Sequence, residues 1–275
     1  MISHPNCKIN LGLHVMRRCS DGYHDLETVF VPVPLCDTLD ISPAESFSFT
    51  QDGIALDGDT ESNLVVKAYR LMQKEFGKRI PVCDIRLTKN IPTGAGLGGG
   101  SSDAAFTIKM LNTLSGLGLP TTTMEALAAR LGADCAFFIN NQTAFATGIG
   151  DHLTPLGFNP LSGYRLLMVK PDEAVSTAEA YGGITPREQR SDIQPCDLIN
   201  AVKRPAKEWN RLVVNDFEET VFAKHPHLAE IKQTLYDTGA LYAAMSGSGS
   251  TMYGIFGSDA NIEHIFNCNT YTFKL

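Results

Sequence analysis

The sequence predicts a two-domain α+β protein, because short β-like runs, helical periodicity and two glycine clusters alternate along a chain of ordinary composition. Hydrophobic residues make up 43% of its 275 residues and charged residues 19%, which leaves ample apolar material for a buried core. The texture changes near residues 155–162, where Pro155 and Pro160 interrupt the pattern. We therefore predict an N-terminal domain of residues 1–158 and a C-terminal domain of residues 159–275.

Charge and cysteine content argue against several functional classes. The net charge of −7 argues against broad binding to nucleic acid or to an anionic membrane, because both need a basic face. The seven cysteines are scattered without a CxxC pair, which favours a reducing compartment over a disulfide framework or a zinc site. The N-terminus lacks the pattern of a signal peptide, and no stretch approaches the roughly 18 apolar residues of a membrane span. We expect a cytoplasmic protein.

The N-terminal half is predicted to begin with strands and to continue with helices. Turn residues such as Asp21-Gly22 separate the strand-like runs. A helix is also expected between Thr122, which has capping-box spacing to Glu125, and Gly132. The other predicted elements of this half are strands at 9–15, 26–33, 38–41 and 47–50, a helix at 64–76, a strand at 82–88 and a helix at 101–114.

The C-terminal half is predicted to mix strands and helices again. Its expected elements are a strand at 164–170, helices at 215–223 and 227–238, and strands at 241–245 and 251–256. The last two strands flank a second glycine cluster at residues 246–250, which reads Ser-Gly-Ser-Gly-Ser. This cluster is either a plain hairpin turn or a loop that closes over phosphates.

The strongest chemical signal is the glycine loop, residues 92–102. Five glycines within seven residues let the backbone approach a bulky anion, and the helix that follows adds the positive end of its dipole. Ser101 and Ser102 could cap this helix or contact a phosphate or a magnesium ion. A dinucleotide-binding loop is disfavoured because no strong acidic candidate for a ribose follows, and a Walker A loop because no lysine follows. A flexible glycine turn is the simplest alternative.

Three other groups of polar residues could carry chemistry. Lys8 and Asn10 point to one face of the first predicted strand, which suits an oxygen-rich, charged ligand, although a lone lysine there is more often exposed. Asp134 follows a glycine-ended helix and could accept a proton from a substrate hydroxyl, or could simply be a turn aspartate. Tyr23 and His24 follow a turn. Taken singly, they are more often a packing aromatic and a surface histidine.

Together these segments resemble the GHMP kinase superfamily. The resemblance implies a two-domain GHMP kinase fold, with an N-terminal ATP-binding and catalytic domain and a C-terminal α/β sandwich-like domain. Within the superfamily the chain is similar to the enzymes of non-mevalonate isoprenoid precursor synthesis whose substrate is a CDP-linked methylerythritol. The segments that carry the resemblance, in the family's order and over nearly the whole chain, are Lys8-Ile9-Asn10-Leu11, Asp21-Gly22-Tyr23-His24, PTGAGLGGGSSDAA from Pro92, Gly132-Ala133-Asp134 and residues 246–250.

The resemblance implies transfer of the γ-phosphoryl group of ATP to the 2-hydroxyl of the methylerythritol unit, with Mg²⁺ bridging phosphates and with metal ligands left open. Asp134 would be the catalytic base and Lys8 the catalytic lysine. Substrate would be bound by Asn10, Tyr23, His24 and Tyr181, of which Tyr181 lies in a weakly matching region. The residues that would bind ATP are Pro92, Thr93, Gly94, Ala95, Gly96, Leu97, Gly98, Gly99, Gly100, Ser101, Ser102, Asn63 and Lys89.

Two departures from the family's pattern and three rival functions remain. Cys135-Ala136 stands where the family often has Val-Pro, and the chain ends soon after Asn269, but neither departure touches a proposed catalytic atom. The rivals are a sister kinase acting on mevalonate, homoserine or a sugar, a non-catalytic nucleotide-binding regulator, and a Rossmann-type dehydrogenase. The presence of both Lys8 and Asp134 argues against the regulator. The partner that we expect is a small molecule, not nucleic acid or membrane.

Overall fold

The computed structural model describes residues 1–55, 58–192, 196–262 and 266–275, and its contacts divide the chain into two compact units. These units do not follow chain order, because two long strands and the glycine loop each contribute residues to both. The predicted domain boundary between residues 158 and 159 stays a prediction. The first unit consists of Met1–Lys8, Pro32–Thr93 and Gly98–Gln142, and the second of Ile9–Val31, Gly94–Leu97 and Thr143–Leu275.

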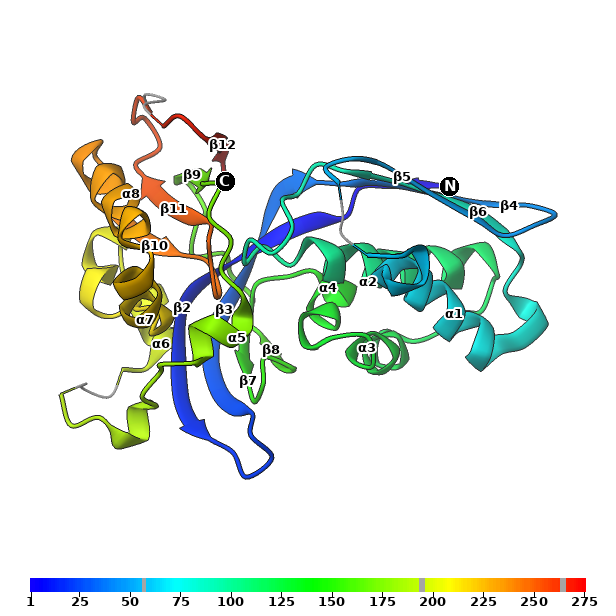
Figure 1. The fold of residues 1–275 in the computed structure, drawn as a ribbon, viewed down its shortest axis with the longest axis horizontal. Coiled ribbons are helices and arrows are strands. Elements are labelled where there is room, and N and C mark those ends of the chain that lie inside the picture. Colours follow the sequence, from blue (N-terminus) through cyan, green and yellow to red (C-terminus); the bar gives the residue numbers. More distant parts are fainter. Residues whose placement is uncertain (56–57, 193–195, 263–265) are drawn as a thin grey trace. The chain divides into compact units, whose positions relative to one another are not determined.

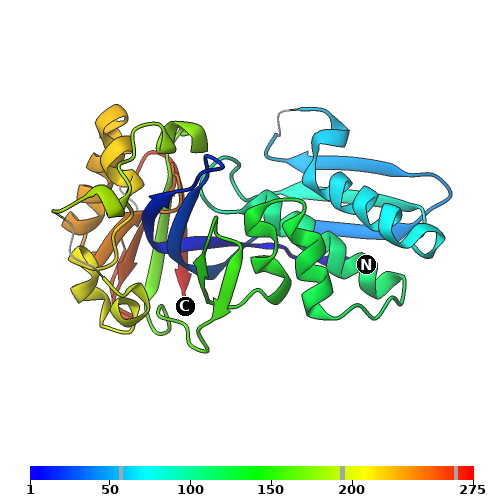
Figure 2. The ribbon, with the colours of Figure 1, turned by 90° about the horizontal axis from the view of Figure 1, so that it is seen from below.

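The first unit is a four-stranded sheet covered on one face by helices (Figures 1 and 2). The strand order is β1-β4-β6-β5, in which only β5 and β6 pair in parallel. Alternate side chains of β6 are buried, as expected for a sheet with one covered face. The strands are β1 (Ile2–Ser3), β4 (Thr38–Pro43), β5 (Ser48–Gly53) and β6 (Cys83–Lys89), and the helices are α1 (Leu64–Phe76), α2 (Gly99–Leu114), α3 (Thr121–Ala129) and α4 (Phe137–Asn140).

Helix α1 starts where the sequence predicts it. The side chain of Asn63 accepts a hydrogen bond from Val65 N at 2.9 Å, which satisfies one of the free amides at the helix start. The apolar face of α1, which includes Tyr69 and Met72, is buried, and α1 packs against α2. Because Asn63 acts as the N-cap, its side-chain oxygen is fixed at the start of α1.

The predicted capping box of α3 is wrong. The helix begins at Thr121 with Pro120 as its N-cap, and no side chain bonds to the free amides there. Glu125 instead accepts a hydrogen bond from Asn140 Nδ2 at 3.0 Å. The fixed φ of proline already suits a helix start, so this helix can begin without a hydroxyl cap.

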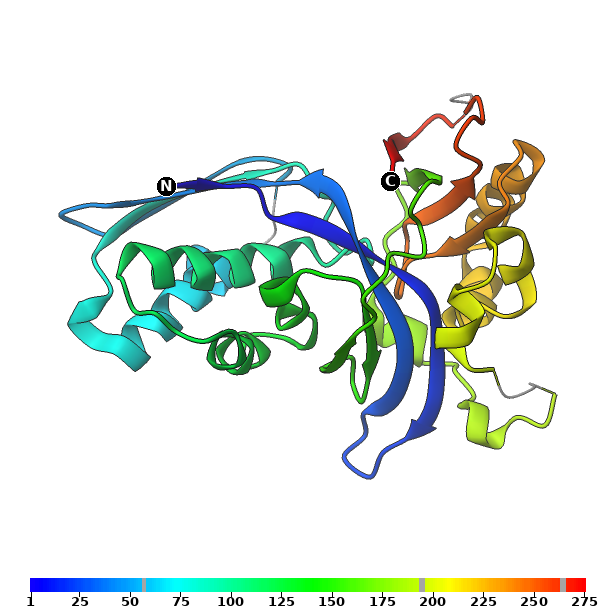
Figure 3. The same cartoon turned by 180° about the vertical axis from the view of Figure 1, so that it is seen from behind.

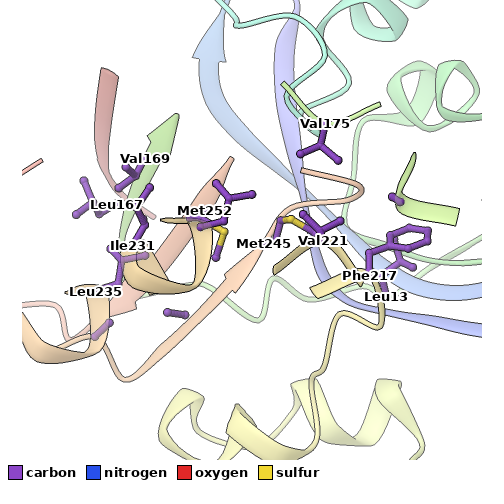
Figure 4. Packing of buried hydrophobic residues seen from close by; sticks show 14 of the residues in the cluster. Leu13, Leu167, Val169, Val175, Phe217, Val221, Ile231, Leu235, Met245 and Met252 are labelled. Carbon is purple, nitrogen blue, oxygen red and sulfur yellow. The ribbon is translucent and has the colours of Figure 1, made fainter. Parts of the chain in front are cut away.

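The second unit contains a four-stranded antiparallel sheet of order β10-β11-β9-β12, against which helices α7 and α8 lie (Figures 1 and 3). Its core combines apolar residues of the sheet with those of α7 and α8, among them Leu167, Val221 and Leu235 (Figure 4). The elements are β9 (Arg165–Lys170), β10 (Tyr242–Met245), β11 (Met252–Phe256), β12 (Asn269–Lys274), α5 (Thr177–Tyr181), α6 (Leu198–Val202), α7 (Phe217–Lys224) and α8 (Pro226–Asp237).

A third sheet, of order β2-β3-β7-β8, contains the two long N-terminal strands. Strands β2 and β3 are joined by a turn at Gly22, whose φ of 90° favours glycine. The strands are β2 (Asn6–Arg18), β3 (His24–Cys36), β7 (Ala144–Thr147) and β8 (His152–Pro155). In the part of the chain that the structure describes, no helix has the length and apolar character of a membrane span.

Candidate functional site

The glycine loop owes its shape to an alternation of small and apolar residues. Gly94, Gly96 and Gly98 have φ angles of 58°, 74° and 69°, in the left-handed region that side chains rarely adopt. The intervening Ala95 and Leu97 are buried. The apolar side chains therefore anchor the loop, while the glycines turn its backbone.

Helix α2 begins within this loop, at Gly99, and Gly98 is its N-cap. Neither Ser101 nor Ser102 caps the helix, so that part of the expectation is wrong. Both serines lie in the first turn of α2. The buried Oγ of Ser102 has no hydrogen-bond partner among the described residues. The first amides of a helix have no acceptor within it, so the start of α2 offers donors suited to an anion.

Lys8 and Asp134 come together in the first unit. Lys8 Nζ lies 3.4 Å from Asp134 Oδ2. The lysine side chain is 4% exposed and the aspartate 34%, so the pair has a buried cation and an accessible carboxylate. Asp134 is carried by a short 3₁₀ turn, Ala133–Cys135, after Gly132. The alternative of an exposed strand lysine is therefore wrong.

The pair also lies beside the start of α2. A Cβ atom placed on Gly98 would be 3.2 Å from Lys8 Cε and 3.1 Å from the ring of Phe138. A side chain at position 98 would clash with the side chain of Lys8. The glycine thus lets the helix start, with its anion-binding amides, approach the Lys8–Asp134 pair closely.

A cavity of about 320 Å³ opens beside the same helix start, within the size range of ligand sites. It brings together four of the predicted ATP contacts, Asn63 from the start of α1 and Lys89, Thr93 and Gly100 from β6 and the glycine loop. The lining residues are Phe49, Gln51, Gly58, Asp59, Thr60, Ser62, Asn63, Leu64, Lys89, Thr93, Gly100 and Asp103.

Lys89 is bound to two carboxylates that the sequence analysis did not identify. Its side chain is 1% exposed, donates to Asp103 Oδ2 at 2.7 Å and forms a short contact with Asp37 Oδ2. Burial lowers the pKa of Lys89, but the two carboxylates, Asp103 and Asp37, raise it by more than burial lowers it. The net pKa is therefore raised, and the lysine stays charged. Asp103 directly follows the loop in the Ser-Ser-Asp run, a position that could have signalled its role, whereas Asp37 carries no comparable signal.

Within the second unit, residues 246–251 contact the part of the glycine loop that belongs to this unit, Gly94–Leu97. Ser246 Oγ donates to Gly96 O at 2.9 Å, and Thr251 N donates to Ala95 O at 3.3 Å. A Cβ atom on Gly96 would lie 1.9 Å from Ser246 O, so no side chain fits there. The cluster connects β10 and β11, but it also holds Gly94–Leu97, so it is more than a plain hairpin turn.

The predicted substrate-binding residues of the second unit differ in their surroundings. Asn10 is buried and donates to Thr28 Oγ1 at 3.0 Å. His24 stacks on Tyr181, with ring centroids 4.8 Å apart and planes at 24°. Tyr23 is 61% exposed at the turn between β2 and β3. Partial burial, and secondarily Arg18, lowers the pKa of His24, which favours a neutral imidazole with one donor and one acceptor.

The described residues contain no group of three or more His, Cys, Asp or Glu that could hold a metal ion. Magnesium is usually held by one or two carboxylates, waters and the phosphates of a substrate. We assign the ion to no residue. All seven cysteines are free thiols.

Comparisons with known proteins agree with this arrangement. Family models described as "GHMP kinases N terminal domain" and "GHMP kinases C terminal" match residues 63–148 and 198–274. A Bacteroides thetaiotaomicron 4-diphosphocytidyl-2-C-methyl-D-erythritol kinase is 49% identical, over 100% of this chain and 99% of its own. The enzyme of that name from Cytophaga hutchinsonii is 45% identical, over 96% of this chain and 95% of its own.

Solved structures show the same similarity. A crystal structure of 4-(cytidine 5'-diphospho)-2C-methyl-D-erythritol kinase matches with a TM-score of 0.78 and 32% identity, over 93% of this chain and 90% of that one. The Methanococcus jannaschii mevalonate kinase matches with a TM-score of 0.69 but only 12% identity, over 94% and 92% of the two chains. The second similarity shows the fold alone.

Proposed function

This chain belongs to the GHMP kinase family, and we propose that it transfers the γ-phosphoryl group of ATP to the 2-hydroxyl of 4-diphosphocytidyl-2-C-methyl-D-erythritol. The observation that carries this proposal is the Lys8–Asp134 pair, 3.4 Å apart, beside the glycine that starts α2. The names of full-length relatives at 45–49% identity support the choice of substrate and of non-mevalonate isoprenoid synthesis as the pathway. Mevalonate and homoserine kinases share the fold at 12–20% identity, which does not favour their substrates.

In this proposal each of these segments has one task. The amides at the start of α2 and the backbone of the glycine loop bind phosphate oxygens, on which negative charge develops during transfer. Asp134 accepts or orients the proton of the attacking hydroxyl, for which its accessible carboxylate is suited. Lys8, which lies 3.4 Å from Asp134, offsets charge on the transferred group. Magnesium, when bound with ATP, would neutralise phosphate charge.

One assay tests the proposal directly. Purified protein with ATP should release ADP when the CDP-linked methylerythritol is added, and not when mevalonate, homoserine or a free polyol is added. Turnover of mevalonate in place of the CDP-linked compound would indicate a sister kinase. ATP binding without any turnover would instead indicate a non-catalytic nucleotide-binding protein.

The glycine loop yields a second prediction, for which Gly100 is the best position. A Cβ atom on Gly100 would meet only Leu64 Cδ1, at 3.5 Å, and the residue is exposed in the cavity. Gly100→Ala should therefore fold normally but hinder backbone approach to the phosphates. We expect about tenfold weaker ATP binding, the equivalent of one charge-assisted hydrogen bond of roughly 1.5 kcal/mol, measured by calorimetric titration.

Gly99→Ala is the matched contrast. A Cβ atom there would lie 2.8 Å from Ile91 Cγ2, so this variant should lose thermal stability, whereas Gly100→Ala should melt as the wild type does. Gly99 is one of the positions that sequence alone suggests for such a test, but the structure makes its result ambiguous. Unchanged ATP affinity in Gly100→Ala would mean that the start of α2 does not bind the phosphates.

A further inference from the structure

Three charged side chains lie buried beneath the start of α2, and their charges do not balance. Lys89 contacts both Asp37 and Asp103, and all three residues are at most 2% exposed. One cation and two ionised carboxylates would leave a net charge of −1 in the core. Burying an uncompensated charge is strongly unfavourable, so one carboxyl group is expected to be the natural place for a proton.

The hydrogen bonds identify which carboxyl group this is. Both carboxylate oxygens of Asp37 have hydrogen-bond donors, as suits an ionised group. Its Oδ1 accepts from the backbone amides of Asn90 at 2.6 Å and Ile91 at 2.8 Å, while Oδ2 contacts Lys89. Asp103 Oδ2 accepts from Lys89, but Asp103 Oδ1 has no partner among the described residues although it is buried. Of the two, Asp103 is therefore the group that a proton would stabilise.

Asp103 also lines the cavity of about 320 Å³, together with Gly100 and Thr93 of the glycine loop. The triad lies close under this loop, because a Cβ atom on Gly99 would be 3.3 Å from Lys89 Nζ. An ionised Asp103 would repel the phosphates of a nucleotide in this cavity. A neutral Asp103 would carry no charge to oppose those phosphates, although its Oδ1 is buried and does not itself reach the cavity.

We propose that Asp103 is a proton-linked residue of the nucleotide site, which takes up one proton from solvent when the nucleotide binds and is then a neutral carboxylic acid. This inference rests on the proposed function, because it assumes that the cavity beside α2 receives ATP. Its charged neighbours are Lys89 at the end of β6, Asp37 between β3 and β4, and Asp59, which lines the same cavity. Helix α1 contributes the apolar Leu64 there.

The electrostatics of the free site place the titration in an accessible range. Burial raises the pKa of Asp103 to about 7, against the opposing effect of Lys89 and with a further increase from Asp37. The bound anion raises the pKa of Asp103 again. The affinity for ATP is therefore greatest at a pH below the pKa of Asp103 in the free protein, and it falls as the pH rises through that pKa. Between pH 6 and pH 8 the Kd for ATP should increase about tenfold.

Calorimetric titration of the full chain with ATP, without the second substrate, tests this inference. Repeated at pH 7 in two buffers of different ionisation enthalpy, it should show uptake of roughly half a proton per nucleotide. Asp103→Asn places a permanently neutral side chain of the same shape at this position. This variant should bind ATP without proton uptake at Asp103, with a Kd at pH 8 lower than that of the wild type.

Two controls separate the possible outcomes. Glu218→Gln removes another buried carboxyl group, in the second unit, whose pKa burial also raises, and it should leave the proton uptake unchanged. The titration of ATP itself contributes equally to every variant. If ATP binds and Asp103→Asn shows the same proton uptake as the wild type, or weaker binding at every pH, the inference is wrong but the proposed function stands. Failure of ATP to bind at all would overturn both.

Discussion

Replacing Asp134 by asparagine is expected to lower kcat by about 10²- to 10⁴-fold, the range of contributions from a positioned general base. Asparagine keeps the shape of the side chain but cannot accept the proton of the attacking hydroxyl. The accessible carboxylate contributes little packing, since 34% of the side chain is exposed, so the fold should persist. Steady-state kinetics with the CDP-linked substrate measures the effect, and the KM for ATP should change little.

A second carboxylate of the same unit provides the control. Asp84 lies on β6, and its carboxylate is bound to Ser48 and Arg86. Asp84→Asn should therefore keep kcat within a factor of about two, because it removes a negative charge without touching the pair. If Asp134→Asn retained the turnover of Asp84→Asn, Asp134 would be a turn residue, and the Lys8–Asp134 pair could no longer carry the proposed function.

Much of the secondary structure could be predicted from the sequence, because local patterns determine it. Helix α1 has the predicted bounds of residues 64–76, and α2 ends at the predicted Leu114 but starts at Gly99, two residues before the predicted start. Strands β7, β8 and β12 were not predicted. They are four to six residues long. Strands β7 and β12 pair with β3 and β9, far away in the sequence, whereas β8 pairs with the neighbouring β7. The false capping box of α3 shows the converse, a local pattern that is present in the sequence but not used in the fold.

The site was predictable where residues carry a motif, and not where they depend on tertiary contacts. The resemblance to the family pointed to Lys8 and Asp134, and the structure places them in contact. Nothing in the sequence indicated that Lys89 would be bound by Asp37, 52 residues away. The contact between Ser246 and Gly96 is also invisible in the sequence, because 150 residues separate them. Spacing along a chain does not reveal pairs at such separations.

Truncation of Tyr23 to alanine is expected to raise the KM for the CDP-linked substrate roughly 5- to 150-fold, corresponding to about 1–3 kcal/mol of stacking on a base. Tyr23 is the exposed aromatic at the turn before β3, so its ring is available to a ligand. His24 and Tyr181 already stack on each other, and Tyr181 meets the edge of Phe217 with ring centroids 4.8 Å apart. Steady-state kinetics would measure both KM values, and that for ATP should stay nearly constant.

The matched variant Tyr23→Phe distinguishes stacking from hydrogen bonding, since it keeps the ring and loses only the hydroxyl. Stacking by Tyr23 predicts a nearly unchanged KM in Tyr23→Phe. His24→Ala is a weaker test, because it removes a ring that stacks on Tyr181 as well as any polar contact to cytosine, and a backbone contact could survive it. If Tyr23→Ala weakened ATP and left the KM of the CDP-linked substrate unchanged, the exposed aromatic would serve the other nucleotide. Selection of a cytidine diphosphate group would then have to come from residues other than Tyr23.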